Sequence, residues 1–119
     1  MNKRQTGAQK EQQVCAYLIS KGICIKEQNF RCRQGEIDLI GYDGEYLVFF
    51  EVKYRSSGRK GCAAQAVGLT KQRKICRVAD YYRMMHHCAE DTPIRFDVVA
   101  VENGRLEWIR DAFGYIGLG

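Results

Sequence analysis

Three carboxylates and one ammonium group lie inside two apolar stretches of residues 35–56, GEIDLIGYDGEYLVFFEVKYRS. They belong to Glu36, Asp38, Glu51 and Lys53. Carboxylates that share a site of low dielectric repel one another, and Mg²⁺ or Mn²⁺ bound between them removes that repulsion. A lysine beside the ion can orient a water molecule or stabilise the charge that develops on a phosphate. These residue types are therefore compatible with a metal site at which a phosphate could be bound.

The two stretches must form a β-hairpin to bring these groups together. Asp43-Gly44 between two apolar runs is a strong hairpin signal. If these two residues form the loop, Asp38 lies opposite Phe49 and diagonal to Glu51, on the same face because side chains alternate along each strand. The predicted charged face then carries Glu36, Asp38, Glu51 and Lys53, and the predicted apolar face carries Ile37, Leu39, Val48, Phe50 and Val52.

A surface hairpin whose alternating charges face solvent is the alternative. It accounts for the charges, but less well for Ile40, Leu47 and Phe49, which the same register places on the charged face. A one-residue bulge in either strand would also change which side chains share a face. The residues alone leave these alternatives open.

The elements around the hairpin predict an α/β protein. A helix is expected over 7–21, between a Thr6 N-cap and Gly22, and a second over 62–88, interrupted at 68–70 where Thr70 caps its second part. A turn and strand are expected over 22–33, strands over 36–41, 46–54, 94–101 and 105–109, and a loop over 56–61. This order predicts a single domain, residues 1–119, with a central mixed sheet of about five strands flanked by helices.

Glu11 lies on the apolar stripe of the first predicted helix, three residues before Val14 and seven before Leu18. Side chains at these spacings share a helix face, so Glu11 is expected to face inward. The alternative is an ordinary carboxylate near the helix N-terminus, where the helix dipole favours an anion.

The charge distribution is compatible with a nucleic-acid partner. The chain has 19 Lys and Arg against 14 Asp and Glu, a net charge of +5. Its basic residues cluster at 3–4, 31–33, 53–60 and 71–77. Such clusters could converge on one phosphate-binding surface, or they could be ordinary solvated charges.

Two further features bear on compartment and metal content. No apolar run approaches the ~20 residues of a membrane span, and none follows the basic residues at the N-terminus, so we expect a soluble cytoplasmic protein with no membrane partner. The six cysteines lack the pairwise spacing of a zinc site. Cys15 and Cys76 fall on apolar helical stripes, which predicts small buried hydrophobic residues.

Asp38, a hairpin and Glu51-Val52-Lys53 together resemble the PD-(D/E)XK nuclease motif. GEIDLI followed by FEVKYR is more specific, and on these segments the chain resembles the YraN family, also called UPF0102. Its members are predicted endonucleases distantly similar to archaeal Holliday junction resolvases. The other matching segments, in chain order, are Glu11, Asn29-Phe30-Arg31, Lys71 with Ile75, Arg95-Phe96-Asp97-Val98-Val99 and Ala112-Phe113. Two positions depart from the usual pattern or vary within it, Phe50 and Tyr54.

The resemblance implies a restriction-endonuclease-like fold in which Asp38, Glu51 and Lys53 are catalytic. It also implies that Asp38, Glu51 and the Val52 backbone carbonyl hold Mg²⁺ or Mn²⁺. Glu11 corresponds to a helical glutamate that resolvase-like relatives add to the site, where it would bind a second ion or order the water.

Two further acidic residues have less certain roles on this resemblance. Glu36 is either another ligand or the partner of Arg31 or Arg33. Asp97 is expected to be structural.

We therefore expect an endonuclease that hydrolyses phosphodiesters of branched or structured DNA. The residues expected to contact nucleic acid are Arg31, Arg33, Arg55, Arg59, Lys60, Lys71, Arg73 and Lys74. Cutting a junction needs two active sites, which is compatible with a homodimer. The alternatives are a nucleic-acid-binding module of the same fold that does not cleave, and a protein-interaction domain.

Overall fold

A computed structural model describes residues 3–55 and 67–118, except for the side chains of residues 3–10 and 55. Within these residues the elements are α1 (Lys3–Ser20), β1 (Cys24–Cys32), β2 (Gly35–Asp43), β3 (Tyr46–Arg55), α2 (Leu69–Met85), β4 (Ile94–Glu102) and β5 (Arg105–Phe113). Their order agrees with the sequence pattern. The predicted 56–61 loop and residues 62–66 of the second predicted helix lie outside the described residues.

Gly22 follows the end of α1 with φ 97°, as predicted for the glycine after that helix, but both predicted N-caps are wrong. The first helix, α1, begins at Lys3, so Thr6 lies inside it. The second helix, α2, begins at Leu69, and its N-cap is Gly68, which has no side chain to bond the free N–H groups. Hydroxyl residues are favoured at N-caps, but glycine is also accepted there at a cost of only a few tenths of a kcal/mol relative to them.

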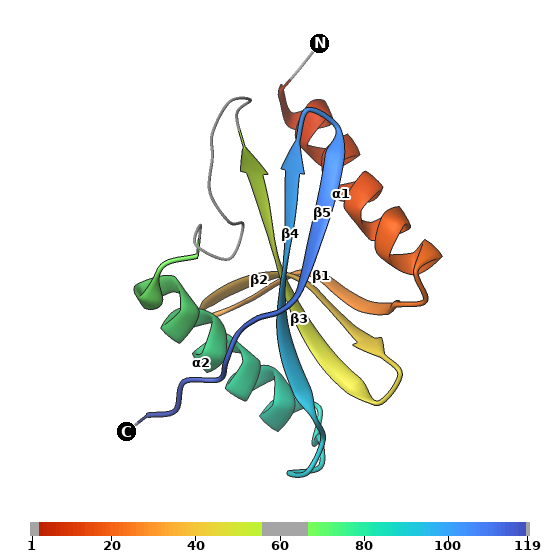
Figure 1. Ribbon diagram of the computed structural model, residues 1–119. Helices are drawn as coiled ribbons and strands as arrows, with labels where there is room; N and C mark the ends of the chain where they lie inside the picture. The colour runs from red at the N-terminus through yellow and green to blue at the C-terminus, as the bar shows by residue number, and fades with distance from the viewer. Residues whose placement is uncertain (1–2, 56–66, 119) are drawn as a thin grey trace.

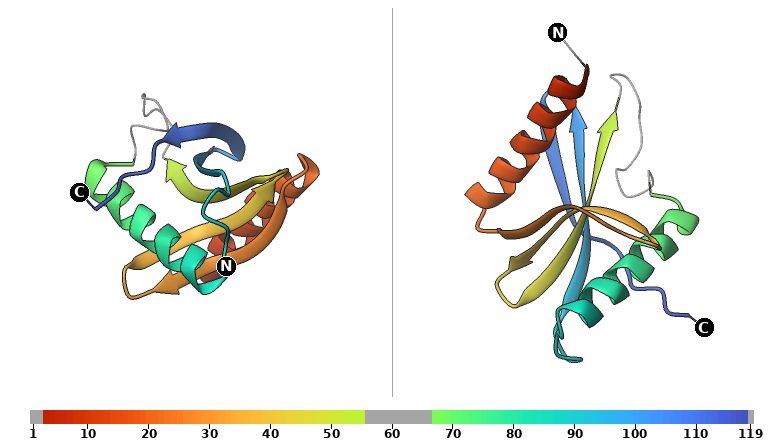
Figure 2. Two further views of the ribbon diagram at one scale, coloured as in Figure 1. Left: turned by 90° about the horizontal axis from the view of Figure 1, so that it is seen from below. Right: turned by 180° about the vertical axis from the view of Figure 1, so that it is seen from behind.

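The strands form one mixed sheet in the order β1-β2-β3-β4-β5. Only β3 and β4 pair in parallel, and the other neighbours are antiparallel. Since parallel strands need a long crossover, α2 lies between β3 and β4 in the chain. Figures 1 and 2 show α1 and α2 on opposite sides of a strongly twisted sheet. This is the restriction-endonuclease-like α/β architecture expected from the sequence.

Each face of the sheet packs against its own helix. Between the sheet and α1 lies a cluster that includes Val14, Leu18, Leu39, Val48, Phe50 and Val99. Between the sheet and α2 lies a cluster that includes Ile40, Leu47, Phe49, Ile75, Val78, Tyr82 and Phe96. Consecutive residues of β3 therefore enter opposite cores, as expected for a strand with a parallel neighbour and covered on both faces. The solvent-facing hairpin considered above is excluded.

The β2–β3 loop consists of Gly44 and Glu45, not of Asp43 and Gly44, because Asp43 pairs with Tyr46. Gly44 has φ 60°, and a glycine with positive φ in the first loop position is typical of a two-residue hairpin. The register therefore differs from the predicted one by two residues. Because the side-chain period is also two, the predicted faces of Leu39, Ile40, Leu47, Val48, Phe49 and Phe50 are preserved. The change before Asp38 is described below.

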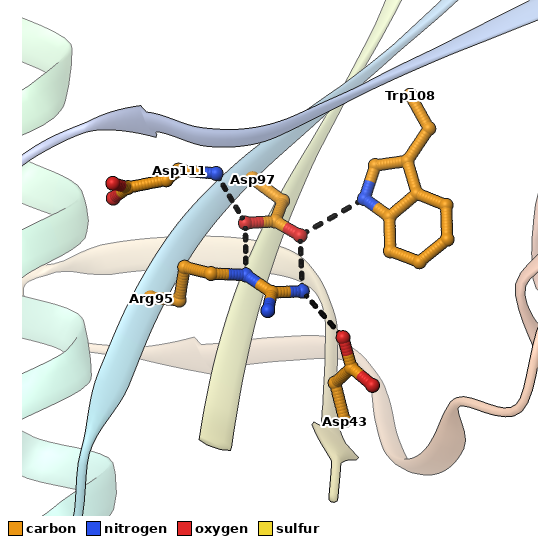
Figure 3. Close-up of polar contacts among 5 residues, drawn as sticks. All are labelled: Asp43, Arg95, Asp97, Trp108 and Asp111. Atoms are coloured by element: carbon orange, nitrogen blue, oxygen red, sulfur yellow. Dashed lines mark hydrogen bonds and ion pairs between the residues drawn. The ribbon is translucent and has the colours of Figure 1, made fainter.

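The Asp97 side chain connects β4 to β5 through a group of hydrogen bonds (Figure 3). This side chain is fully buried and accepts four hydrogen bonds, each 2.9 Å long. Two come from the Arg95 guanidinium, one from Trp108 Nε1 and one from the Asp111 backbone N–H. Arg95 also donates to Asp43 at 2.9 Å, which connects β4 to the end of β2. Asp97 is thus structural, as expected.

Candidate active site

The β2–β3 ladder ends just before the predicted catalytic carboxylates. Its last pair is Leu39 with Phe50, so the register brings Asp38 and Glu51 together where the two strands stop pairing. Beyond this point the Val52 N–H donates to the Asp38 carboxylate, with 2.7 Å between N and Oδ2. The Asp38 carboxylate therefore takes the place of the next backbone acceptor, and the backbones of β2 and β3 separate at Asp38.

The β1–β2 pair also bends at the position of Asp38. Asn29 lies opposite Asp38 in the register and has a left-handed backbone with φ 53°. Among residues other than glycine, asparagine is one of the few that adopt this conformation readily. Ile37, just before Asp38, packs in the α2 core, although Leu39 packs in the α1 core. The prediction that Ile37 and Leu39 share a face is therefore wrong, because the strand changes its alternation at Asp38.

The Val52 backbone also faces this opening. In an extended strand the N–H and C=O of one residue point toward the same neighbouring strand. Because the Val52 N–H donates to Asp38, we expect the Val52 carbonyl to lie on the same side of β3.

Asp38 and Glu51 form a repelling pair of carboxylates. The Glu51 side chain is only 5% exposed. Burial is the main reason that the pKa of Asp38 is raised to about 7, and the hydrogen bond and charge of Glu51 add to it. The Val52 N–H and the charge of Lys71 oppose this rise of the pKa. Two acidic groups in such a place are the donors that Mg²⁺ and Mn²⁺ prefer.

Lys71, from the first turn of α2, makes the closest contact with Glu51. Its Nζ lies 2.6 Å from Glu51 Oε2. That oxygen is buried and has no hydrogen bond of ordinary geometry, so the contact is best described as an ion pair. Interaction with Glu51 is the main cause that raises the pKa of Lys71, with smaller contributions from Asp38 and Lys53. Lys71 thus lies at Glu51, and Lys53, which is partly buried, lies close enough to Lys71 to affect its pKa.

Glu11 approaches the site from the α1 side. Its side chain is exposed rather than buried in the core. It lines a cavity of about 50 Å³, room for a few water molecules, together with Gln28, Asn29, Asp38, Leu39, Val52 and Tyr54. Burial, and then the charges of Glu11 and Asp38, raise the pKa of Tyr54. In residues 3–55 and 67–118 no group of three His, Cys, Asp or Glu side chains is arranged to hold one metal ion. Glu11 therefore lines the cavity beside Asp38 but does not join Asp38 and Glu51 in such a group.

Glu36 is engaged elsewhere. Its Oε2 lies 3.1 Å from Arg31 Nε, and both side chains are at least half exposed. Of the two roles considered for Glu36, the structure supports the Arg31 partner. Arg33, Arg73 and Lys74 are exposed. The Arg55 side chain, Arg59 and Lys60 lie outside the described part of the chain.

The positions of Cys15 and Cys76 agree with the prediction that they are small buried residues. Cys15 and Cys76 are buried, and none of the five cysteines in the described ranges forms a disulfide. Cys62 lies outside those ranges. No helix within them is long and apolar enough to cross a membrane.

Sequence reasoning missed two positions. It assigned Lys71 to phosphate contacts and found no role for Asn29 beyond the family resemblance. The ion pair of Lys71 depends on how α2 docks against β3, which no local pattern reports. The bend at Asn29 could have been suspected, since asparagine is depleted from regular strands and enriched at positive φ.

Replacing Asp38 by asparagine is expected to stabilise the metal-free protein at pH 8. The pKa of Asp38 is about 7 in the folded protein and 3.8 in its ordinary state, so the folded protein binds more protons between these values. Stability should therefore fall as the pH rises from about 4 to about 7, and it should stay lower above that range. Asparagine keeps an acceptor for the Val52 N–H and removes the charge beside Glu51.

We expect this variant to gain about 1–3 kcal/mol at pH 8 and almost nothing at pH 4. Urea unfolding of the wild type and Asp38→Asn at both pH values measures the difference. A variant that is less stable than the wild type at pH 8 would show that the Asp38 charge is not destabilising.

Comparison with known proteins gives a consistent result. Residues 10–101 match the family described as "Uncharacterised protein family UPF0102". Three proteins named "UPF0102 protein" are similar over nearly their whole length. The one from Lachnoclostridium phytofermentans is 42% identical over 117 residues, covering 98% of this chain and 99% of its own. The one from Nitrosococcus oceani is 41% identical over 114 residues, 92% of each chain.

The third, from Syntrophus aciditrophicus, is 45% identical over 113 residues, 92% of this chain and 88% of its own. The name shared by these relatives states no activity. Both the family match and the relatives extend across the β2–β3 site described above. The chain therefore belongs to the UPF0102 family.

Proposed function

We propose that this protein is a metal-dependent nuclease that hydrolyses phosphodiester bonds. The observation that carries the proposal is the pairing of Asp38 with the buried Glu51 where β2 and β3 separate. Burial, and then the hydrogen bond and charge of Glu51, raise the pKa of Asp38, so the two carboxylates are electrostatically unfavourable neighbours. A divalent cation would relieve this repulsion.

The donor set fits Mg²⁺ or Mn²⁺. Mg²⁺ is usually held by one or two carboxylates, with water and substrate phosphate as its other ligands. Here Asp38, Glu51 and the Val52 carbonyl would hold the ion. The contact of Glu51 Oε2 that coordination would break is the ion pair with Lys71, at 2.6 Å. When bound, such an ion supplies Lewis-acid activation of water and neutralises phosphate charge.

The protein side chains would supply the remaining functions. Lys53 would place the attacking water or stabilise the charge that develops on the phosphate. Glu11 lines the cavity next to Asp38 and would order a water or bind a second ion. The narrow cavity fits an ion and water molecules, not a nucleobase, so the base would remain outside it.

We propose branched or structured DNA as the substrate, consistent with the resemblance to junction resolvases. Arg33, Arg73 and Lys74 are exposed and would contact backbone phosphates. Such contacts carry little base information, so they favour recognition of DNA shape. A homodimer would provide the two active sites that a symmetric junction needs.

An assay with branched and linear DNA in Mg²⁺ or Mn²⁺ tests this function. We expect cleavage of the branched DNA in at least one metal, no cleavage in EDTA, and affinity that falls steeply with salt. Salt-sensitive binding without cuts in either metal would favour a non-catalytic binding module. Absence of binding even at low salt would favour a protein-interaction domain.

A further inference from the structure

Lys71 stands where a cation bound to Glu51 would need to be. Its Nζ is 2.6 Å from an Oε2 atom that is buried and has no hydrogen bond of ordinary geometry. A buried carboxylate must be paired or bound to a metal to avoid a large desolvation cost. In the metal-free protein, Lys71 therefore supplies the main neutralising charge for Glu51.

A divalent cation and Lys71 cannot both stay against this oxygen without strong repulsion. Two positive charges about 3 Å apart repel each other most where the dielectric is low, and the Glu51 side chain is only 5% exposed. The Lys71 side chain is 49% exposed and has a long flexible stem. It can therefore turn toward solvent while Glu51 stays in place.

We propose, on the basis of the nuclease function above, that Lys71 is an exchangeable counter-ion of the active site. It neutralises Glu51 in the metal-free protein and is displaced when a divalent cation binds. The displaced ammonium remains beside the site and is then available to a substrate phosphate. Two consequences follow: displacement lowers the metal affinity of the free protein, and loss of Lys71 should slow cleavage while it strengthens metal binding.

Lys71→Met removes the ammonium and keeps an unbranched side chain. Electron paramagnetic resonance of free Mn²⁺ in a titration of the metal alone should show a dissociation constant about 5–50-fold lower than that of the wild type. Lys71→Arg keeps the charge and should bind Mn²⁺ within about twofold of the wild type. Lys26→Met is the matched control, because Lys26 is an exposed lysine of β1, and it should also bind as the wild type does.

Cleavage of branched DNA by Lys71→Met should be slower than that by the wild type at saturating Mg²⁺. A wild type that does not cut DNA, together with Mn²⁺ binding by Lys71→Met that is tighter than that of the wild type, would contradict the nuclease proposal and support the counter-ion role of Lys71. If folded Lys71→Met binds Mn²⁺ no more tightly than the wild type does, Lys71 is not the proposed counter-ion, even if the wild type is a nuclease.

If Lys71→Met does not fold, NMR of the Lys71 ammonium in the wild type tests the counter-ion role instead. The side-chain ¹⁵N resonance of Lys71 should be protected from rapid proton exchange in the metal-free protein, because its ammonium is ion-paired. Addition of diamagnetic Mg²⁺ should shift this resonance and remove the protection. A Lys71 resonance that Mg²⁺ leaves unchanged, at concentrations that saturate the site, would also overturn the proposal.

Discussion

Lys53→Ala is expected to reduce Mg²⁺-dependent cleavage by about 10²–10⁴-fold while DNA affinity changes by no more than a few-fold. The reason is that Lys53 would act on the water and phosphate at the metal, whereas DNA affinity comes from many phosphate contacts. Single-turnover cleavage and filter binding, performed on the same preparation, separate the two quantities.

Lys26→Ala is the control for this variant, because it removes the same charge from an exposed position on β1. It should cut at close to the wild-type rate. If Lys53→Ala cuts as fast as Lys26→Ala, Lys53 is not catalytic, and Lys71 becomes the candidate for that role.

Asp97→Ala is expected to lower the free energy of unfolding by about 3–5 kcal/mol, a large share of the stability of a domain of this size. The substitution leaves the Arg95 guanidinium, which is only 13% exposed, without its bidentate partner. It also removes the acceptor of Trp108 Nε1. The Asp111 N–H also loses its acceptor. Urea unfolding measured by tryptophan fluorescence would follow the change, with Trp108 as the only tryptophan in the sequence.

Glu107→Ala offers a comparison on the neighbouring strand, because Glu107 is exposed on β5. Its effect should stay within about 0.5 kcal/mol. Comparable stability of the two variants would show that the Asp97 network contributes little. Asp97→Asn, which keeps the shape but loses the charge, should lie between the wild type and Asp97→Ala.

Much of the fold follows from local patterns in the sequence. The apolar runs of β3 and β4 and the stripes of α1 and α2 predict the order of helices and strands, because burial on one or two faces leaves a period that can be counted. The turn between β2 and β3 was placed one residue early. Asp43-Gly44 is a good turn sequence by itself, but Asp43 also pairs with Arg95 from a distant strand, and that contact keeps it in β2.

The candidate site was predictable in its residues but not in its geometry. Alternation along the strands predicted that Asp38 and Glu51 are neighbours, and despite the two-residue error in register the two carboxyl groups are close enough to interact. The bend at Asn29 and Asp38 changes the alternation, which moved Ile37 to the other core. The Lys71–Glu51 ion pair depends on the docking of α2, and a single sequence contains no local signal for it.

This site illustrates a common conflict between stability and activity. Glu51 and Asp38 repel each other in the metal-free protein, and a chain selected for stability alone would replace one of them. Under the proposed function, the two carboxylates would bind a cation at this opening in the sheet and would lower stability without it.

Anomalous diffraction from crystals soaked in Mn²⁺ tests the central claim most directly. A peak between the Asp38 and Glu51 carboxylates, next to the Val52 carbonyl and with Lys71 moved away from Glu51, is the predicted result. A saturating soak that leaves Lys71 on Glu51, with no peak within coordinating distance of both carboxylates, would contradict a metal-dependent active site at this position.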